Sequence, residues 1–257
     1  MRLVDAFTGP GCRGNRAAVV LLEAPLGDRE MQALAAQAGQ PATAFVAARP
    51  DRGAHAVRWF GPAREIALCG HGALAAGHVL LSQTGDSGLN LRTGDGRLIE
   101  LRRAGRESRY ELALPALASE PRDWPELLAV LGAEPRELRW NAAGYALAVY
   151  ANPQEVQALK PDPAALARIG HVQVSASAAG ALSGMATDIT SRVFSSGGRE
   201  DAATGSAHAM LAPFWCARLE RGALVAHQAS ECGGWIECRL EGDRVWLGGR
   251  CAEAAVT

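Results

Sequence analysis

The sequence has no marked excess of charge, no long apolar run and no apolar leader. It carries 26 Lys and Arg against 27 Asp and Glu, a balance that gives no electrostatic footprint for nucleic acid or for an anionic membrane. No apolar stretch approaches the ~18 residues of a membrane span, and the opening residues are interrupted too soon for a signal peptide. We therefore expect a cytoplasmic protein with no nucleic-acid partner and no membrane association.

Cysteines are few and scattered for a chain of this size. The six of them include no Cys-x-x-Cys pair, which argues against a disulfide framework. His227, Cys232 and Cys238 are close in sequence but lack the compact spacing of metal ligands, so we predict no metal site. The chain does have 48% apolar residues over 257 positions, enough to bury a substantial core in one large domain or in two of about 100–150 residues.

Apolar patterning predicts many short strands and few helices. Strands are expected at 3–8, 17–22, 43–48, 55–60, 89–92, 97–102, 109–114, 145–150, 172–176 and 191–195. Helices are expected at 28–38, 126–131, 152–159 and 162–169, the first capped by Asp28 and with Met31, Leu34, Ala35 and Ala38 on one face. The Pro-rich segment 115–125 is the best candidate for a boundary between two domains.

One junction carries more chemistry than the rest of the chain. The segment 65–81 runs from a short strand through a glycine-flanked turn into a helix of small residues. Gly70 and Gly72 allow backbone conformations closed to other residues, and the helix directs N–H groups and its positive dipole end at the turn. Such a turn can hold a substrate carboxylate. Cys69 and His71 add a thiol and a proton carrier, although a tight turn with a buried Cys and a hydrogen-bonded His fits the same residues.

A second junction, about half a chain later, is similar to the first. In the segment 197–215 a strand again passes through small residues into an apolar helix, and Thr204-Gly205-Ser206 matches Cys69-Gly70-His71 of the first junction. Two similar halves would place two helix N-termini face to face, with a cleft that holds a small acid from both sides. Pro213 fits such a helix only within its first turns or at a mild kink.

Three motifs in register carry a family resemblance. They are Phe7-Thr8 with Gly14-Asn15-x-Ala17-Ala18-Val19, then Leu68-Cys69-Gly70-His71, then Glu200-Asp201-x-x-Thr204-Gly205-Ser206-Ala207-His208. Together they resemble the phenazine-biosynthesis isomerase family, whose members have the diaminopimelate-epimerase fold. The resemblance implies an α+β fold of two pseudo-symmetric half-barrels, each wrapped around a central helix, with the active site between them and commonly a homodimer.

The resemblance also implies two domains and a type of chemistry. The halves would be 1–115 and 116–257, with central helices from about 70 and about 205, and it stays open whether the last strand returns to the N-terminal half. Enzymes of this kind need no cofactor and move protons on small amino or carboxylic acids. We therefore expect a small-molecule acid as the substrate.

The family's principal acid/base is a glutamate, and the matching position in 39–45 is Ala42. A methyl group cannot exchange a proton. Because a well-placed acid/base group typically contributes 10²–10⁴ in rate, the family's reaction should not proceed here by its usual route. Arg16 and Cys232 are further departures, where the family usually has a proline and an arginine.

The motifs retain other residues that support chemistry. Asp201 matches the family's second carboxylate, as a base or an orienting group, and its alternative is a solvated helix-capping Asp. His71 matches a site histidine that binds the carboxylate or relays a proton, and its alternative is a hydrogen-bonded turn residue. The N–H groups of Gly70, Gly72, Gly205 and Ser206 and the Ser206 side chain complete the anion site, while Asn15 either touches substrate or stabilises a turn.

Cys69 resembles the first of two catalytic cysteines in the epimerases that share this fold, and Thr204 takes the place of the second. A thiol with a hydroxyl opposite removes a proton on one face without replacing it on the other, which suits isomerisation or dehydration better than racemisation. The alternative for Cys69 is a small buried residue. Glu65 and His78 are expected to be structural, and His208 fits either role.

The sequence therefore predicts a cofactor-independent isomerase that moves a proton or a double bond on a small carboxylate-bearing metabolite, in secondary metabolism. The predicted catalytic residues are Asp201, His71 and Cys69, and the predicted substrate-binding residues are Asn15, Gly70, Gly72, Thr204, Gly205 and Ser206. The alternatives are an inactive relative that binds such a ligand and a dehydratase-like variant that uses Cys69 and Thr204.

Overall fold

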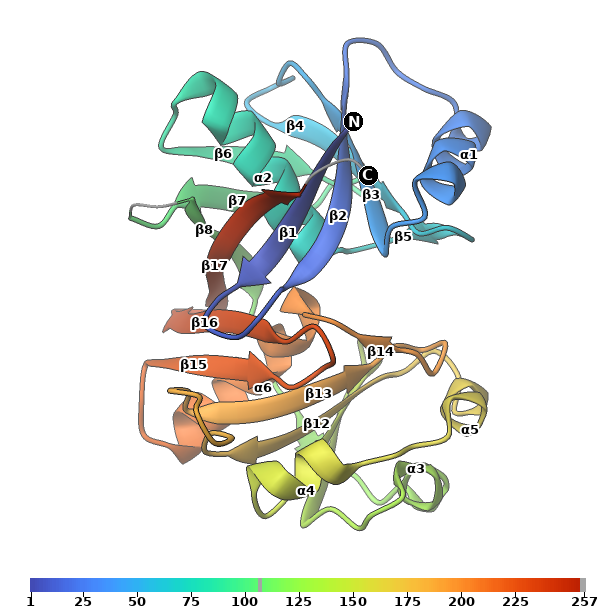
Figure 1. Cartoon of the computed structure of the whole chain (residues 1–257), viewed down its shortest axis with the longest axis vertical. Helices are drawn as coiled ribbons and strands as arrows, with labels where there is room; N and C mark the ends of the chain where they lie inside the picture. Colours follow the sequence, from blue (N-terminus) through green and yellow to red (C-terminus); the bar gives the residue numbers. More distant parts are fainter. Residues whose placement is uncertain (106–107, 255–257) are drawn as a thin grey trace. The chain divides into compact units, whose positions relative to one another are not determined.

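The computed structural model describes residues 1–105 and 108–254, and these have the α+β fold that the sequence predicts. Contacts group the chain into two units, whose elements are labelled in Figure 1. Unit 1 comprises Met1–Gly9, Arg13–Leu114 and the chain from Trp246 onward, and unit 2 comprises Pro10–Cys12 and Pro115–Val245. No helix of the described residues is long and apolar enough to cross a membrane.

Unit 1 contains two helices and most of the strands of the first half of the chain. Its strands are β1 (Arg2–Thr8), β2 (Asn15–Leu22), β3 (Ala42–Ala47), β4 (His55–Phe60), β5 (Glu65–Ile66), β6 (Gly88–Arg92), β7 (Leu98–Arg103), β8 (Arg109–Pro115) and most of β17 (Arg244–Ala254). Its helices are α1 (Asp28–Ala38) and α2 (Gly70–Thr84).

Unit 2 contains the remaining helices and strands. Its strands are β9 (Glu120–Pro121), β10 (Glu137–Asn141), β11 (Tyr145–Val149), β12 (Gln173–Ala179), β13 (Ile189–Phe194), β14 (Glu200–Asp201), β15 (Ala223–Gln228) and β16 (Gly234–Glu241). Its helices are α3 (Pro125–Leu131), α4 (Pro153–Ala158), α5 (Pro163–Arg168) and α6 (Gly205–Arg218).

The two units repeat one pattern of strand pairing. In unit 1, β1–β2, β3–β4, β4–β5 and β6–β7 are antiparallel, while β2–β3 and β4–β6 are parallel. In unit 2, β10–β11, β12–β13, β13–β14 and β15–β16 are antiparallel, while β11–β12 and β13–β15 are parallel. The long helices follow matching strands, with α2 after β5 and α6 after β14. The similarity predicted at the two junctions therefore extends over the units that contain them.

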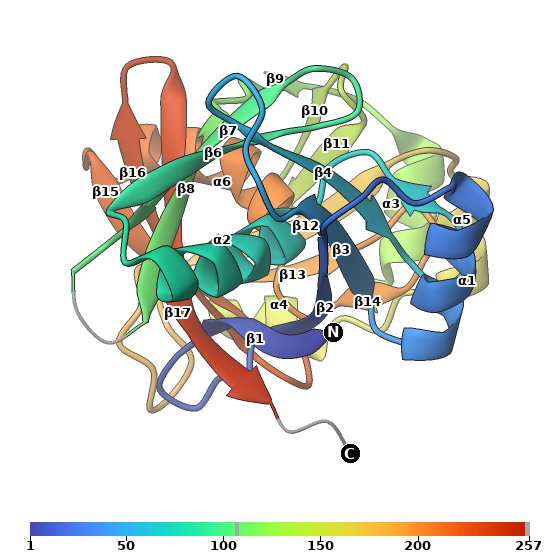
Figure 2. The same ribbon diagram turned by 90° about the horizontal axis from the view of Figure 1, so that it is seen from above.

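Each unit has one long helix that is buried along most of its length. In unit 1, α2 packs against β1, β2, β3, β6 and β7 (Figure 2), and residues 70–81 are all buried. In unit 2, α6 packs against β11, β12, β15 and β16, and residues 205–212 are all buried. Small and apolar residues make up most of both helices and no continuous polar face is present, so the helices are stable only when strands cover them on several sides.

The structure corrects two predictions about α1. Gly27, not Asp28, is its N-cap, and the Asp28 carboxylate instead accepts a hydrogen bond from Arg58. Leu34 is 39% exposed, because the buried face of the helix is formed by Met31 and Ala35. The predicted helix is confirmed, but its buried face is narrower than predicted and does not include Leu34.

Other corrections concern the second half of the chain. Pro213 lies inside α6, as the ninth of its 14 residues, so of the two positions expected for it the first turn is excluded. The strands β10, β15, β16 and β17 are not among the predicted ones, although 223–228 and 244–254 form long ladders. These segments mix polar, glycine and apolar residues, and they become strands because neighbouring strands pair with them rather than through a local pattern.

Candidate active site

Both junctions are preceded by the same kind of ion pair. In unit 1, Arg58 of β4 donates two hydrogen bonds to Glu65 of β5, at 2.7 and 2.8 Å. In unit 2, Arg192 of β13 donates two to Glu200 of β14, at 2.8 and 2.7 Å. The hydrogen bond from Arg58 lowers the pKa of Glu65, which confirms the structural role expected of this carboxylate. Each pair fixes the chain just before the turn that leads into the long helix.

The two turns have matching backbone geometry. Cys69 is the N-cap of α2, with φ −133° and ψ 99°, and Thr204 is the N-cap of α6, with φ −123° and ψ 96°. Neither side chain accepts a hydrogen bond from its own helix. No capping side chain therefore competes with an anion for the N–H groups of the first turn, at Gly70 or at Gly205.

In unit 1 the structure brings together Asn15, Cys69 and His71. Asn15 Nδ2 is 3.2 Å from His71 Nδ1, a hydrogen-bond contact that holds the imidazole ring in place. The Cys69 sulfur is 3.5 Å from Nδ1 and 3.7 Å from Nε2. All three residues are buried. A thiol beside an imidazole at a helix N-terminus is an arrangement that favours a thiolate and a proton relay.

The strand register places Ala42 on the side of the sheet that faces this cluster. Ala42 is opposite Ala17 of β2, two residues from Asn15, while Trp59 of β4 is opposite Ala44, two residues from Ala42. Alternate residues of a strand share a face, so the side chains of Asn15, Ala42 and Trp59 point to one face of the sheet. Because Asn15 bonds the α2 histidine on that face, a longer side chain at position 42 would extend toward the first turn of α2.

In unit 2 a hydrogen-bonded cluster joins Asp201, Thr204 and Gln228. Thr204 Oγ1 donates to Asp201 Oδ2 at 2.6 Å, and the Ala202 N–H donates to Oδ1 at 3.0 Å. Gln228 accepts from the Thr204 N–H at 2.8 Å and donates to the Asp201 carbonyl at 2.7 Å. Ser206 follows in the first turn of α6 and is buried. Asp201 is therefore not the capping residue of the helix, and its carboxylate is held in one orientation.

Two residues of these clusters are missing from the predicted site. Gln228 reaches the α6 turn from β15, and its separation of 24 residues from Thr204 gives no local signal for the contact. Ser230 Oγ in turn donates to the Ala202 carbonyl at 2.7 Å. Trp59 lies against the α2 turn, and nothing local separates it from an ordinary core aromatic residue.

The remaining histidines of the long helices belong to the core. His78 Nδ1 is 3.2 Å from the Tyr110 hydroxyl, and the two rings meet edge to face, which confirms the expected packed role. His208 is completely buried and donates from Nδ1 to the Thr204 carbonyl at 2.8 Å. Burial lowers the pKa of His208 to about 4. A neutral histidine bonded to the N-cap of its own helix is structural, which decides between the two roles that the sequence left open.

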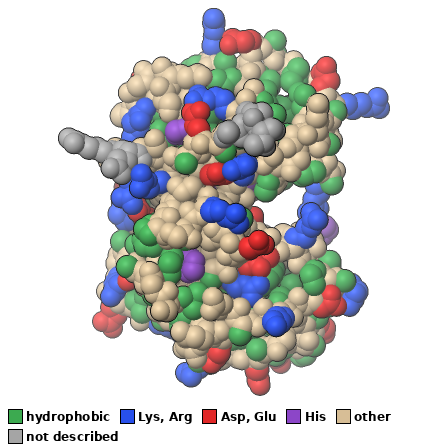
Figure 3. Space-filling model, in the orientation of Figure 1, with side chains coloured by type: hydrophobic (Ala, Val, Ile, Leu, Met, Phe, Trp, Pro, Cys, Tyr) green, Lys and Arg blue, Asp and Glu red, His purple; other side chains and the backbone are tan. Residues whose placement is uncertain are grey.

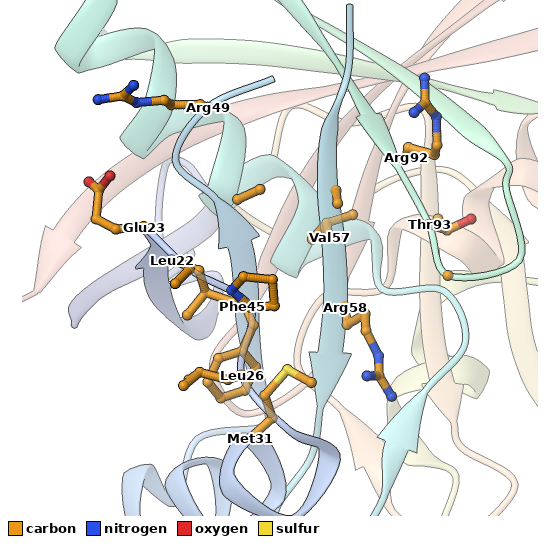
Figure 4. A pocket seen from close by; sticks show the side chains of 15 residues that line it. Leu22, Glu23, Leu26, Met31, Phe45, Arg49, Val57, Arg58, Arg92 and Thr93 are labelled. Atoms are coloured by element: carbon orange, nitrogen blue, oxygen red, sulfur yellow. The ribbon is translucent and has the colours of Figure 1, made fainter. Parts of the chain in front are cut away.

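Three cavities of the described residues are lined by none of the predicted site residues. Over residues 1–105 and 108–254, no three His, Cys, Asp or Glu side chains are placed to hold a metal ion, and all six cysteines are free thiols. Charges of both signs are interspersed on the face shown in Figure 3. A cavity of about 380 Å³ beside α1 is lined by residues that include Leu22, Leu26, Met31, Phe45 and Arg49 (Figure 4). It contains none of the predicted site residues.

Comparison with known proteins identifies relatives over the whole chain. The chain is 38% identical over 255 residues to an uncharacterized isomerase of Pseudomonas aeruginosa, with 98% of this chain and 95% of that protein aligned. A phenazine biosynthesis protein of the PhzF family from Enterococcus faecalis superposes with a TM-score of 0.86 at 32% identity, covering 99% of this chain and 96% of that one. A hydroxyproline epimerase from Agrobacterium vitis shares the fold, with a TM-score of 0.62 at 13% identity over 99% and 91% of the two chains.

The family model agrees with these relatives. Residues 4–254 match the model described as phenazine biosynthesis-like protein. Relatives named as isomerases support an isomerase-type enzyme. With matching motifs, a matching fold and matches along nearly its entire length, this chain belongs to the phenazine biosynthesis-like protein family.

Proposed function

We propose that this chain is a cofactor-independent isomerase of secondary metabolism that moves a proton or a double bond on a small amino or carboxylic acid. The observation that carries the proposal is the contact of the Cys69 sulfur with His71 at the N-terminus of α2, where Asn15 fixes the imidazole ring. The contact supports the proposed roles of a base, a proton relay and an anion-binding helix end, which this reaction needs within one cluster.

The first turn of α2 is the proposed carboxylate site. Gly70 and Gly72 supply backbone N–H groups of the first helical turn, and the helix dipole adds positive potential. In unit 2, Thr204, Gly205 and Ser206 form the equivalent turn, which is the proposed second set of binding groups.

The proposed reaction conserves protons within the substrate. Cys69, as a thiolate, accepts a proton from one carbon of the acid, and the resulting thiol returns a proton to another carbon, directly or through His71, which regenerates the thiolate. One C–H bond breaks and one forms, so the balance requires no oxidant and no reductant. The fixed carboxylate of Asp201 is proposed to orient the substrate's amino group or to act as a second base.

Ala42 supports one alternative, a relative that binds the acid without converting it. Its methyl group lies on the face of the sheet toward α2 and offers no proton to exchange. The third possibility, a dehydratase-like reaction through Cys69 and Thr204, has less support, because Thr204 Oγ1 already donates to Asp201 at 2.6 Å.

Hydrogen–deuterium exchange tests the proposal. The chain is incubated in D₂O, without added cofactor, with a panel of amino and cyclohexadiene carboxylic acids, and deuterium in the recovered acids is measured by mass spectrometry. We expect incorporation with at least one acid, reduced by roughly 10² or more in Cys69→Ala and in Asp201→Asn. Cys216→Ala, which removes a buried thiol outside both clusters, is the matched control and should retain the rate.

The other outcomes assign the alternatives. If acids raise the melting temperature of the protein but take up no deuterium, the protein binds the acid without converting it. Release of water from an acid would indicate the dehydratase-like reaction. If Cys69→Ala and Asp201→Asn combined lose little more than either alone, the two residues act in one reaction. The proposed homodimer and cytoplasmic location are checked by sedimentation velocity and by cell fractionation.

A further inference from the structure

We propose that the indole N–H of Trp59 donates a hydrogen bond to the Cys69 sulfur and stabilises it as a thiolate. Trp59 is then a positioning residue for the thiol. The inference rests on the proposed function for the use made of the thiolate. The ionisation of Cys69 is nevertheless measurable without any substrate, so the two ideas can fail separately.

Trp59 Nε1 is a buried donor that lacks an acceptor. The side chain is 1% exposed, and within residues 1–105 and 108–254 no acceptor meets its N–H. The nitrogen is also closed to water, so in this arrangement solvent cannot supply the acceptor. Buried donors in folded proteins are nearly always paired, so an unpaired one requires an explanation, and an acceptor close enough to reach it is one such explanation.

The polar edge of the indole and the Cys69 sulfur border the same small space over Gly72. A Cβ added to Gly72 would be 2.8 Å from Trp59 Cδ1, 2.9 Å from Cys69 Sγ and 3.0 Å from Trp59 Nε1. The edge of the ring that carries the N–H therefore faces the side of Gly72 on which the sulfur lies. The space remains open to the indole N–H and to the sulfur because residue 72 is a glycine and has no side chain.

The repeat in unit 2 shows that packing alone does not require an indole here. Trp59 pairs with the second residue of β5, and Val193 pairs with the second residue of β14, so Val193 is its counterpart. Gly72 and Ala207 are the third residues of α2 and α6. A valine with an alanine fills this position in unit 2, whereas unit 1 has a tryptophan with a glycine. This difference between the units places an N–H donor at the helix end that carries the thiol.

A thiolate gains more from this donor than a thiol does, because hydrogen bonds to a charged acceptor are stronger than those to a neutral one. The sulfur is at the N-terminal end of α2, and His71 is a titratable side chain that contacts it, at 3.5 Å. Glu65, on the strand before the turn, is held by Arg58. The proposed bond forms when rotation about the Cys69 Cα–Cβ bond brings the sulfur to the N–H.

The test measures Cys69 ionisation in the full chain. Thiolate absorbance in the far ultraviolet is followed against pH for the unaltered protein minus Cys69→Ser, and again with both in a Trp59→Phe background. Phenylalanine keeps an aromatic ring and removes the N–H. We expect the titration midpoint to rise by about one pH unit, which lowers the thiolate fraction roughly tenfold at pH values well below the midpoint. Trp215→Phe is the matched control, since it removes a buried indole N–H that donates to Ser177 at 3.0 Å, and it should leave the midpoint unchanged.

A second measurement avoids any change at Trp59. In protein with ¹⁵N-labelled tryptophan, one indole N–H resonance should shift as Cys69 ionises, and the shift should be absent in Cys69→Ser. The inference would be overturned if the titration midpoint were unchanged in Trp59→Phe, or if none of the six indole N–H resonances shifted as Cys69 ionises. Altered ionisation without deuterium exchange into any acid would instead retain the inference and reject the isomerase.

Discussion

Single residues distinguish two units that otherwise follow one plan. Cys69 and Thr204 have nearly the same backbone angles as N-caps, yet one supplies a thiol and the other a hydroxyl that is bound to a carboxylate. His71 and Ser206 differ in the same way, two residues further on. The repeated backbone thus provides two similar helix ends, and the side chains give each of them its own chemistry.

Gly72 is closely packed against Trp59 and the Cys69 sulfur. In Gly72→Ala the new methyl group would overlap Trp59 and the Cys69 sulfur, at 2.8 and 2.9 Å, so we expect a loss of about 1–3 kcal/mol in the free energy of unfolding. Gly94→Ala, which meets nothing within 4 Å, is the control and should change little. Chemical denaturation measures both.

A double variant tests whether residues 59 and 72 occupy one shared space. Trp59→Val combined with Gly72→Ala reproduces the pair that unit 2 uses, Val193 with Ala207. Because the smaller side chain makes room for the methyl group, the combined loss of stability should be smaller than the sum of the single losses. Strict additivity would show that residues 59 and 72 do not share one space.

His208 makes stability depend on pH. Its folded pKa is about 4, lowered by burial, against 6.5 in the unfolded chain, so the unfolded state binds more protons between these values. Stability contributed by neutral His208 is therefore fully present above pH 6.5 and is lost as the pH falls toward 4. From pH 7 to 5 we expect a loss of about 2 kcal/mol that His208→Asn does not show. Urea unfolding of both proteins at the two pH values checks this, and equal losses would contradict it.

Among the elements, the short strands β5 and β14 connect the sheets to the helix ends. Each has two residues, too few to hold a fixed position by backbone pairing alone. The Arg58–Glu65 and Arg192–Glu200 pairs add side-chain bonds across the same strand pairs. The position of each turn is therefore set from the strand side, before the helix begins.

The two arginines should differ in their effect on stability. The Arg192 side chain is 13% exposed and also donates to the Leu159 carbonyl at 2.6 Å, whereas Arg58 is 31% exposed and binds two exposed carboxylates. We expect Arg58→Met to cost about 1 kcal/mol and Arg192→Met about 3, because the latter leaves buried acceptors unpaired. Thermal unfolding measures the order, and a larger loss in Arg58→Met would contradict it.

Over the whole molecule, the chain returns to its first unit at the end. β17 pairs with β1 from Leu3 opposite Ala254 onward, and it also pairs with β8. Leu247 and Trp246 are buried, with the Arg102 guanidinium 3.7 Å above the Trp246 ring. Unit 1 is therefore incomplete without the last segment of the chain.

This connection predicts how fragments behave. Residues 1–114 alone leave the β1 edge unpaired and remove buried apolar side chains, so we expect no cooperative unfolding transition and a tendency to aggregate. The same fragment joined to residues 246–257 by a Gly/Ser linker should unfold cooperatively. Circular dichroism during heating compares them, and a cooperative transition of the short fragment would show that β17 is dispensable.

Local pattern was enough to predict a large part of this protein. Glycines, small residues and apolar runs identified the two helices that begin at Gly70 and Gly205, because propensity and helix termination depend on neighbours in sequence. The motifs around them led to the fold class, which the solved structures confirm. They also identified Cys69, His71 and Asp201 as chemically interesting, since those groups are recognisable by type and spacing.

Tertiary structure alone decided what surrounds those groups. Strand register put Asn15, Ala42 and Trp59 on one face, and pairing of distant strands brought Gln228 to Thr204. A one-residue shift in register would have turned each of these side chains to the opposite face, and no local pattern fixes the register. The sequence thus determined which chemistry the helix ends carry, while the non-local packing of strands determined which donors and methyl groups those ends meet.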